Sequence, residues 1–288
     1  MTVDSSAADQ GLWTKFWQEF AAENELQERC HIPGDGRELV DTHWRQFAND
    51  LPQEARIVDL GCGAGIVGRT LLKQRSDLVV DGIDFAGVPQ LNVPNLTIHR
   101  WVPMEALPFE ANSIDAAVSL YGIEYGNLSA TAAELQRVLR PGSSFSFLIH
   151  HADSETVREG STRRRALRLL FGGKIKSAFL AGNTERLDQQ IRAIDKELPS
   201  EAWVGIATKF FNRKISLPRV PRESAWHDFV TALSPEAALL ARLERAAKSS
   251  AGLAAWLEPL IATMQQVSVA VMRRRSNEPI AWKVSGIR

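Results

Sequence analysis

Four glycines in eleven residues, Val58-Asp59-Leu60-Gly61-Cys62-Gly63-Ala64-Gly65-Ile66-Val67-Gly68, follow an apolar run, and no other stretch limits the fold as much. The apolar run is followed by Gly-x-Gly-x-Gly and then by a helical pattern over 66–74. This order is typical of a strand, a tight turn and a helix. Glycine tolerates such a turn and has no Cβ atom that would clash with a ligand. The loop therefore predicts a ligand site where the backbone comes very close to the bound molecule.

The segments on either side of this loop predict a parallel sheet. Short β-type runs alternate with helical or turn segments, and strands are predicted over 57–60, 78–84, 96–100, 114–120 and 144–150. A helix is predicted over about 130–139, stopped by Pro141-Gly142. Strands joined by helical connections form mainly parallel sheets covered on both faces. Such sheets bind ligands at the carboxyl ends of their strands.

Helical patterns flank this core on both sides. An aromatic stripe at helical spacing predicts a first helix that either packs on the core or covers a substrate; its residues are Trp13, Phe16, Trp17 and Phe20. Further helices are predicted over 37–49, 163–179, 185–197, 235–249 and 253–274. The tail over 279–285 alternates like a strand that returns to the edge of the sheet.

The predicted fold class is α/β, a Rossmann-like, doubly wound, mainly parallel sheet with an N-terminal helical cap and a large helical insertion after the fifth strand. The predicted divisions are the cap over 1–50, the ligand-binding core over 51–152, the insertion or substrate cap over 153–275, and the returning strand over 276–288.

Charge and cysteine content narrow the function classes. The 34 Lys and Arg residues balance the 34 Asp and Glu residues, so bulk charge gives no reason to expect a dedicated polyanion binder. Cys30 and Cys62 are too few for a disulfide framework. No signal segment opens the chain, and no apolar run approaches the roughly 20 residues that span a bilayer. We therefore expect a cytoplasmic protein without a transmembrane segment.

Two kinds of ligand fit a glycine loop, a dinucleotide or a nucleoside without phosphates. Dinucleotide loops are spaced Gly-x-Gly-x-x-Gly so that helix amides hold a pyrophosphate. Here the spacing is Gly-x-Gly-x-Gly, and Asp59 would repel a pyrophosphate but attract an ammonium group. This favours S-adenosylmethionine, which carries an ammonium and a positive sulfonium. Asp84, at the end of the next strand, is the predicted ribose ligand, with Asp81 as the competing candidate.

Four sequence blocks over roughly residues 56–151 resemble class I S-adenosylmethionine-dependent methyltransferases with a type 11/25-like core. They are Val58 to Gly65, Asp81 to Asp84, Leu107-Pro108-Phe109 followed by Ser113-Ile114-Asp115, and Glu134 to Gly142. The resemblance implies S-adenosylmethionine as the cofactor, the ribose on Asp84 and the adenine beside the segment before Leu107. It implies that the glycine loop contacts the methionine portion, through Asp59, Gly61, Cys62, Gly63 and Gly65.

One position departs from that family. Its members commonly carry an Asp four residues before the Leu of the third block, where this sequence has Pro103. Adenine recognition then falls to the Met104 backbone amide, to Glu105 or to stacking on Phe85. Tyr121, directly after the fourth strand, completes the cofactor-binding candidates.

Candidate catalytic residues follow the fourth and fifth strands. Methyl transfer from a sulfonium is an in-line displacement, so the protein must align a nucleophile and, for a hydroxyl, supply a base. Glu124 follows the fourth strand, and His150 and His151 end the fifth. An imidazole suits a general base, although each of these residues also has a purely structural interpretation. Adjacent strand residues point to opposite faces, so only one histidine is expected to meet the substrate. No metal site is predicted.

The predicted activity is transfer of a methyl group to O or N of a small molecule, and the sequence names neither that molecule nor the oligomeric state. The basic stretch Arg163 to Lys176 has an RNA or membrane-surface interpretation beside that of a solvated helix face. No recognisable RNA-binding module accompanies it, so nucleic acid ranks below a small-molecule substrate. An RNA or tRNA methyltransferase and a non-catalytic S-adenosylmethionine-binding protein remain the alternatives.

Overall fold

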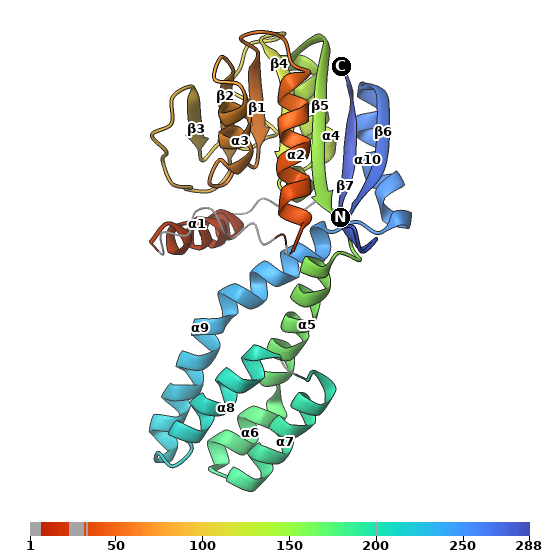
Figure 1. Cartoon of the computed structure of the whole chain (residues 1–288). Coiled ribbons are helices and arrows are strands. Elements are labelled where there is room, and N and C mark those ends of the chain that lie inside the picture. The colour runs from red at the N-terminus through yellow and green to blue at the C-terminus, as the bar shows by residue number, and fades with distance from the viewer. Residues whose placement is uncertain (1–6, 23–31, 33, 200) are drawn as a thin grey trace. The chain divides into compact units, whose positions relative to one another are not determined.

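The computed structural model describes residues 7–22, 32, 34–199 and 201–288 (Figure 1). Cys30 and the side chain of Phe20 lie outside the described part. The chain divides into two compact units, unit 1 with Met1–Thr156 and Ala246–Arg288, and unit 2 with Val157–Arg245. Within the described ranges, every helix is too short or too polar to cross a bilayer.

Unit 1 is built on one sheet. Its described strands number seven, in the order β3-β2-β1-β4-β5-β7-β6. The five strands from β3 to β5 pair in parallel, and β7 runs antiparallel between β5 and β6. The strand bounds are Arg56–Leu60 (β1), Val79–Asp84 (β2), Leu96–Arg100 (β3), Ile114–Leu120 (β4), Leu139–His150 (β5), Gln265–Arg273 (β6) and Pro279–Ile287 (β7).

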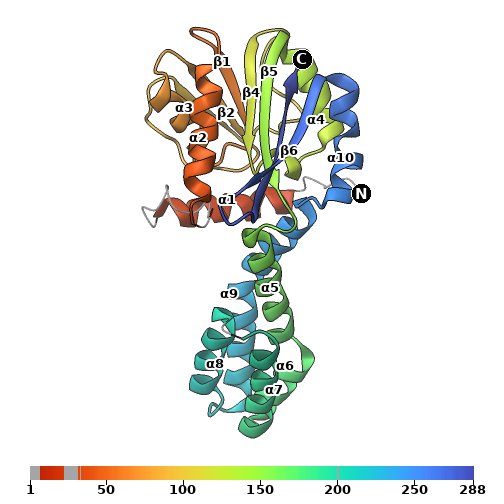
Figure 2. The same cartoon turned by 45° about the vertical axis from the view of Figure 1, so that its right-hand side comes forward.

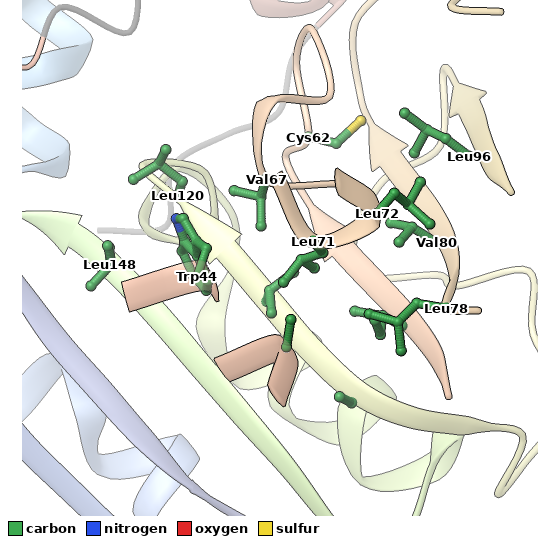
Figure 3. Close-up of a cluster of buried hydrophobic side chains, with 14 of the residues drawn as sticks. Trp44, Cys62, Val67, Leu71, Leu72, Leu78, Val80, Leu96, Leu120 and Leu148 are labelled. Atoms are coloured by element: carbon green, nitrogen blue, oxygen red, sulfur yellow. The ribbon is translucent and has the colours of Figure 1, made fainter. Parts of the chain in front are cut away.

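Helices cover both faces of this sheet. They are α2 (Gly36–Asn49) and α3 (Ile66–Gln74) on one face, and α4 (Leu128–Val138) and α10 (Ser250–Thr263) on the other (Figures 1 and 2). Trp44 of α2 and Leu71 of α3 lie in one buried cluster with Leu148 of the sheet (Figure 3). Leu135 and Leu257 lie in the cluster on the opposite face. Burial on both faces explains the continuous apolar runs of the central strands, and the predicted doubly wound α/β fold is confirmed.

Unit 2 is helical and has its own core. Its elements are α5 (Glu155–Leu170), which leads into it, α6 (Gly173–Ala181), α7 (Thr184–Glu197), α8 (Ala202–Lys214) and α9 (Arg219–Ala246), which leads out. Phe179, Phe211, Trp226 and Phe229 pack against one another in that core, with ring centroids 4.8–6.3 Å apart. Aromatic side chains bury large apolar areas, so a short helical segment of this kind sustains a separate core.

The helix predicted over 253–274 is wrong in its second half. Helix α10 ends at Thr263, and the rest forms strand β6. Val267, Val269 and Val271 recur at the two-residue period of a strand, and pairing with β7 fixes that conformation. The returning strand β7 consequently lies inside the sheet, and β6 takes the edge position that the sequence assigned to the tail.

Other elements also have bounds that differ from the predicted ones. The helix predicted over 163–179 is two helices, because the chain breaks at Phe171 and Gly172. Helix α8 was not predicted, and α9 begins well before the predicted Pro235, which it contains. The compact insertion spans Val157–Arg245, which is narrower than the predicted 153–275, because α10 and β6 belong to unit 1.

Candidate functional site

The glycine loop lies at the ends of β1 and β4. These two strands lie on either side of the topological switch point of the sheet. Gly61 and Gly63 have φ values of 65° and 50°, in the left-handed region that favours glycine. A Cβ atom on Gly61 would lie 2.8 Å from the Cα of Gly122, and one on Gly122 would lie 2.5 Å from the carbonyl oxygen of Leu60. The loops after β1 and β4 therefore pack backbone on backbone, which leaves no room for side chains at these glycines.

Asp59 is a buried carboxyl group beside this loop. Its residue is 1% exposed, and neither carboxylate oxygen makes a hydrogen bond of ordinary geometry within the described residues. Burial raises the pKa of Asp59 to about 8; the Gly68 amide opposes that rise, and the charge of Asp84 adds to it to a smaller extent. A buried carboxyl group without a partner is costly unless a ligand supplies a donor. The ammonium group of S-adenosylmethionine fits this requirement.

The two candidate ribose ligands have different surroundings. Asp84 accepts hydrogen bonds from the Gly63 and Ala86 amides, both at 2.8 Å, which ties the carboxyl end of β2 to the glycine loop. Asp81 instead accepts from Arg56 Nε and His99 Nε2, both at 2.7 Å. The contacts of Asp81 are those of a structural ion pair, and Asp84 is the carboxylate that borders the loop.

The residues predicted to contact the adenine are Phe85, Met104 and Glu105. Phe85 and Met104 are half-buried. Glu105 Oε1 accepts from the Asn127 amide at 2.6 Å, so part of its hydrogen-bonding capacity holds the start of α4. Cys62 is buried, its amide donates to the Ile83 carbonyl, and burial raises the pKa of its thiol. These contacts favour Phe85 and Met104 over Glu105 as the surface for an adenine ring.

Helix α1 (Ala7–Ala22) lies across the carboxyl ends of the strands (Figure 2). Gln10 Nε2 donates to the Phe85 carbonyl at 3.1 Å, and Thr14 Oγ1 accepts from the Gly87 amide at 2.9 Å. The Trp17 ring covers Gly63, where an added Cβ atom would lie 2.3 Å from the indole. Helix α1 therefore contacts the segments that follow β1 and β2, where the ligand site is predicted.

Glu124 and His150 form a buried polar pair at the ends of β4 and β5. Glu124 lies in the short 3-10 helix η1 (Ile123–Tyr125), and its Oε1 accepts from the His150 amide at 2.9 Å. Within the described residues, Glu124 Oε2 and His150 Nδ1 have no hydrogen-bond partner. Burial raises the pKa of Glu124 to about 7 and lowers the pKa of His150 to about 3. At neutral pH Glu124 is therefore poised to exchange a proton, and His150 is neutral.

His151 faces away from that pair, as the alternation of strand side chains predicts. Its ring stacks on Trp282 with centroids 4.4 Å apart, and its Nδ1 accepts from the Asp153 amide at 3.0 Å. Burial lowers the pKa of His151, against the opposing charge of Asp153. These contacts hold the His151 ring against Trp282 and the chain that follows β5.

Tyr121 and Lys248 complete the surroundings of Glu124. Tyr121 has a φ value of 55°, which is strained for a bulky residue, and its ring stacks on His150 at 4.1 Å. The Lys248 amide donates to the His150 carbonyl, and the charge of Lys248 acts on both Glu124 and His150. Sequence reasoning missed Lys248 because it lies far along the chain, between α9 and α10, in no motif. No cluster of metal-binding side chains occurs in the ranges that the structure describes.

Comparison with known proteins agrees with this geometry. The family model described as a methyltransferase domain matches residues 58–147. A 2-phytyl-1,4-naphtoquinone methyltransferase from Synechocystis sp. is 33% identical over 110 residues, which cover 33% of this chain and 45% of that protein. The chain thus matches less than half the length of that curated relative.

The chain is also similar to solved structures. An S-adenosylmethionine-dependent methyltransferase from Aquifex aeolicus is 19% identical with a TM-score of 0.35, over 41% of this chain and 65% of that one. The [4+2]-cyclase SpnF is 12% identical with a TM-score of 0.41, over 89% of this chain and 83% of that one.

The sheet order, the glycine loop and the family match define one class of protein. The chain carries a class I S-adenosylmethionine-dependent methyltransferase domain, and S-adenosylmethionine is the cofactor of that domain.

Proposed function

We propose that the protein transfers a methyl group to an oxygen or nitrogen atom of a small molecule. The observation that carries this proposal is the buried Asp59 carboxyl group beside the glycine loop, whose oxygens make no hydrogen bond of ordinary geometry within the described residues. A second buried acid, Glu124, follows β4 in η1. The Synechocystis relative is by its name a methyltransferase of a naphthoquinone, which supports a small-molecule acceptor.

In this proposal the cofactor is held by residues at the carboxyl ends of β1 and β2. Asp59 binds the ammonium group, Gly61 and Gly63 give the methionine portion access to the backbone, and Asp84 binds the ribose. The bound cofactor supplies an electrophilic methyl group on a positive sulfonium. Trp17 of α1 covers the loop and excludes water from it.

Glu124 is the proposed proton acceptor. Its Oε2, which has no hydrogen-bond partner among the described residues, and its pKa of about 7 suit removal of a hydroxyl proton at neutral pH, whereas the pKa of His150 is too low for that task. His150 then positions Glu124 through its amide and forms an aromatic wall with Tyr121. His151 supports β5 from the opposite face.

Binding measurements test the cofactor assignment directly. We expect isothermal titration calorimetry to detect binding of S-adenosylmethionine and of its demethylated product, and no binding of NAD, because the Gly-x-Gly-x-Gly loop lacks the spacing that holds a pyrophosphate and the buried Asp59 offers an acceptor to an ammonium group. Binding of NAD without binding of S-adenosylmethionine would overturn the assignment. Binding without turnover on a broad substrate panel would instead support the non-catalytic alternative.

Substitution of the two acids on β2 separates ribose binding from structural support. Asp84→Ala is expected to weaken S-adenosylmethionine binding about ten- to a hundredfold, since hydrogen bonds to a charged group contribute about 1.5 to 3 kcal/mol. Asp81→Ala is the matched control, and it should lower thermal stability through loss of its contacts with Arg56 and His99 while affinity stays within about threefold. The opposite pattern in calorimetry would assign the ribose to Asp81.

The RNA alternative receives little support from unit 2. Arg163, Arg164 and Arg165 all form ion pairs with acids of the same unit, the last with Glu197 at 2.5 Å. Comparing metabolites of cells with and without the gene addresses the acceptor itself. Accumulation of an unmethylated small molecule would support the proposal, and undermethylated RNA with unchanged metabolites would contradict it.

A further inference from the structure

Strand β6 forms one edge of the sheet of unit 1 and differs from the strand at the opposite edge (Figure 1). In the described part of the chain, β6 pairs with β7 on one side and with no strand on the other. Every residue of Gln265–Arg273 is exposed or half-buried. The opposite edge, β3, is a five-residue strand that ends in His99 and Arg100. Short edge strands and charged side chains protect sheet edges from further pairing, and β6 is long and carries no charge before Arg273.

Charge is also scarce in the helix that leads into this edge. Residues 249–272, which include all of α10 and most of β6, contain a single charged side chain, Glu258. Two of the large apolar side chains that the described chain exposes lie in the same segment, Ile261 at 53% and Val269 at 44%. Solvated surfaces carry charges on roughly a quarter to a third of their residues. This edge therefore lacks the charges that keep a sheet from joining another one.

The side chains of β6 alternate between the two faces of the sheet. The ladder with β7 is regular over 268–272 and irregular at both ends. Val267 and Val271 pack against the buried cluster that contains the apolar face of α10. Val269 lies between them on the same face and is exposed. The side chains on the other face, those of Ser268 and Ala270, are small and exposed.

The pattern of these side chains is the same when it is read from either end. Val267-Ser268-Val269-Ala270-Val271 has valines at the outer and central positions and small residues between them. An identical antiparallel strand centred on Val269 places Val269 opposite its own copy and Val267 opposite Val271 on one face. Ser268 then lies opposite Ala270 on the other face. Cross-strand pairs stabilise antiparallel sheets, and valine suits the pleated surface. A second copy of the chain supplies this matching strand by symmetry.

The arginines at the end of β6 favour the same arrangement. Arg273, Arg274 and Arg275 follow the valines directly. In a parallel pairing of two copies these arginine runs would lie side by side, and like charges opposite each other destabilise a sheet. In the antiparallel pairing centred on Val269, Arg273 lies opposite the uncharged Gln265 of the other copy. Charge and side-chain pattern therefore select one direction and one register.

We propose that two copies of this chain form a dimer by antiparallel pairing of β6 with β6, about a twofold axis at Val269. The backbone donors and acceptors on the open side of each β6 pair with those of the other copy. The two sheets join into one, and the two α10 helices lie on the same side of it because the axis is perpendicular to the sheet. The interface belongs to unit 1 and does not depend on the methyl-transfer reaction.

Sedimentation velocity with the full chain tests the dimer. We expect a dimer at about 10 µM protein, since interfaces of standard size have micromolar or lower dissociation constants. Val269→Lys places two like charges opposite each other at the axis and should raise the dissociation constant about tenfold or more. Val79→Lys is the matched control, because Val79 is an exposed valine of the same sheet at the start of β2, and its dissociation constant should stay within about threefold. Circular dichroism establishes that each variant is folded.

Cysteine substitution tests the register. In a chain that carries Cys30→Ser, Val269→Cys should form an intermolecular disulfide on air oxidation, because residues directly opposite each other have Cα atoms about 4.5 to 5.5 Å apart. Ala270→Cys is the matched control and should crosslink poorly, since its copy lies diagonally across the joint at about 7 to 8 Å. A monomer at all concentrations, a dimer that Val269→Lys leaves intact, equal weakening by Val79→Lys, or equal crosslinking of the two cysteine variants would each overturn the proposal.

Discussion

Replacement of Glu124 by Gln should lower turnover with a hydroxyl acceptor by about 10²- to 10⁴-fold, the usual contribution of a general base. The amide keeps an oxygen that accepts from the His150 amide, so the fold around η1 is expected to persist. The change removes proton acceptance at Oε2, which has no hydrogen-bond partner in the described structure. Affinity for S-adenosylmethionine should stay within about threefold, because Glu124 is not among its proposed contacts.

The pH dependence of turnover distinguishes Glu124 from the histidines. With Glu124 as base, activity should rise with pH through an apparent pKa of about 7, and this step should be absent in Glu124→Gln. With His150 as base, no step is expected near neutral pH, because burial keeps the pKa of that imidazole at about 3. His150→Ala and His151→Ala are the comparison variants.

Retention of the neutral-pH step in Glu124→Gln would contradict the assignment. Loss of that step in either histidine variant, with normal Glu124→Gln turnover, would return the role of base to the imidazole.

The ligand-free protein should lose stability as the pH rises from 6.5 to 8. Asp59 has a pKa of about 8 when folded and near 3.8 when unfolded, so the folded state binds more protons over this range. Stability that depends on the protonated acid is complete below the unfolded pKa and is lost as the pH rises through the folded pKa. Glu124 acts in the same direction up to its pKa of about 7.

The histidines oppose this trend only partly, and less as the pH rises. The pKa values of His43 and His150 are lowered to about 4 and 3, so protons bound by the unfolded imidazoles, with a pKa near 6.5, destabilise the fold, and this destabilisation fades by about one pH unit above 6.5. Between pH 6.5 and 8 the loss from Asp59 is about 2 kcal/mol in the free energy of unfolding. Urea denaturation at several pH values measures this slope.

Asp59→Asn should remove most of that slope and raise ligand-free stability at pH 8, because no charge then needs to be buried. The same change should weaken S-adenosylmethionine binding about ten- to a hundredfold by loss of the ammonium contact. In the unmodified protein, calorimetry in buffers of different ionisation enthalpy should detect proton release when the ligand binds. An unchanged stability slope together with unchanged affinity in Asp59→Asn would show that this carboxyl group faces no ligand.

The parallel core was predictable because its determinants are local. Strands β3 and β4 have the predicted bounds, because short β-type runs bounded by turn residues mark them, whereas the fifth strand begins at Leu139 and not at the predicted Ser144, so Pro141-Gly142 lie inside β5. The preference for Asp84 over Asp81 as ribose ligand, made from their positions along one strand, stays a prediction.

Contacts between segments far apart in the chain decided the features that the sequence did not predict. Gln265–Arg273 became a strand because β7 pairs with it along most of its length, and this pairing decides between the strand period of its valines and a continuation of α10. The preference for Glu124 over His150 as base arises from burial, which moves the two pKa values in opposite directions, and Lys248 reaches the site only because the chain returns to β5 after the insertion. The sequence by itself determined which strands form and which residue types meet at their ends, because those depend on local periodicity and turn chemistry. Tertiary structure alone decided which of those groups are buried and without a hydrogen-bond partner, because desolvation depends on elements far apart in the chain.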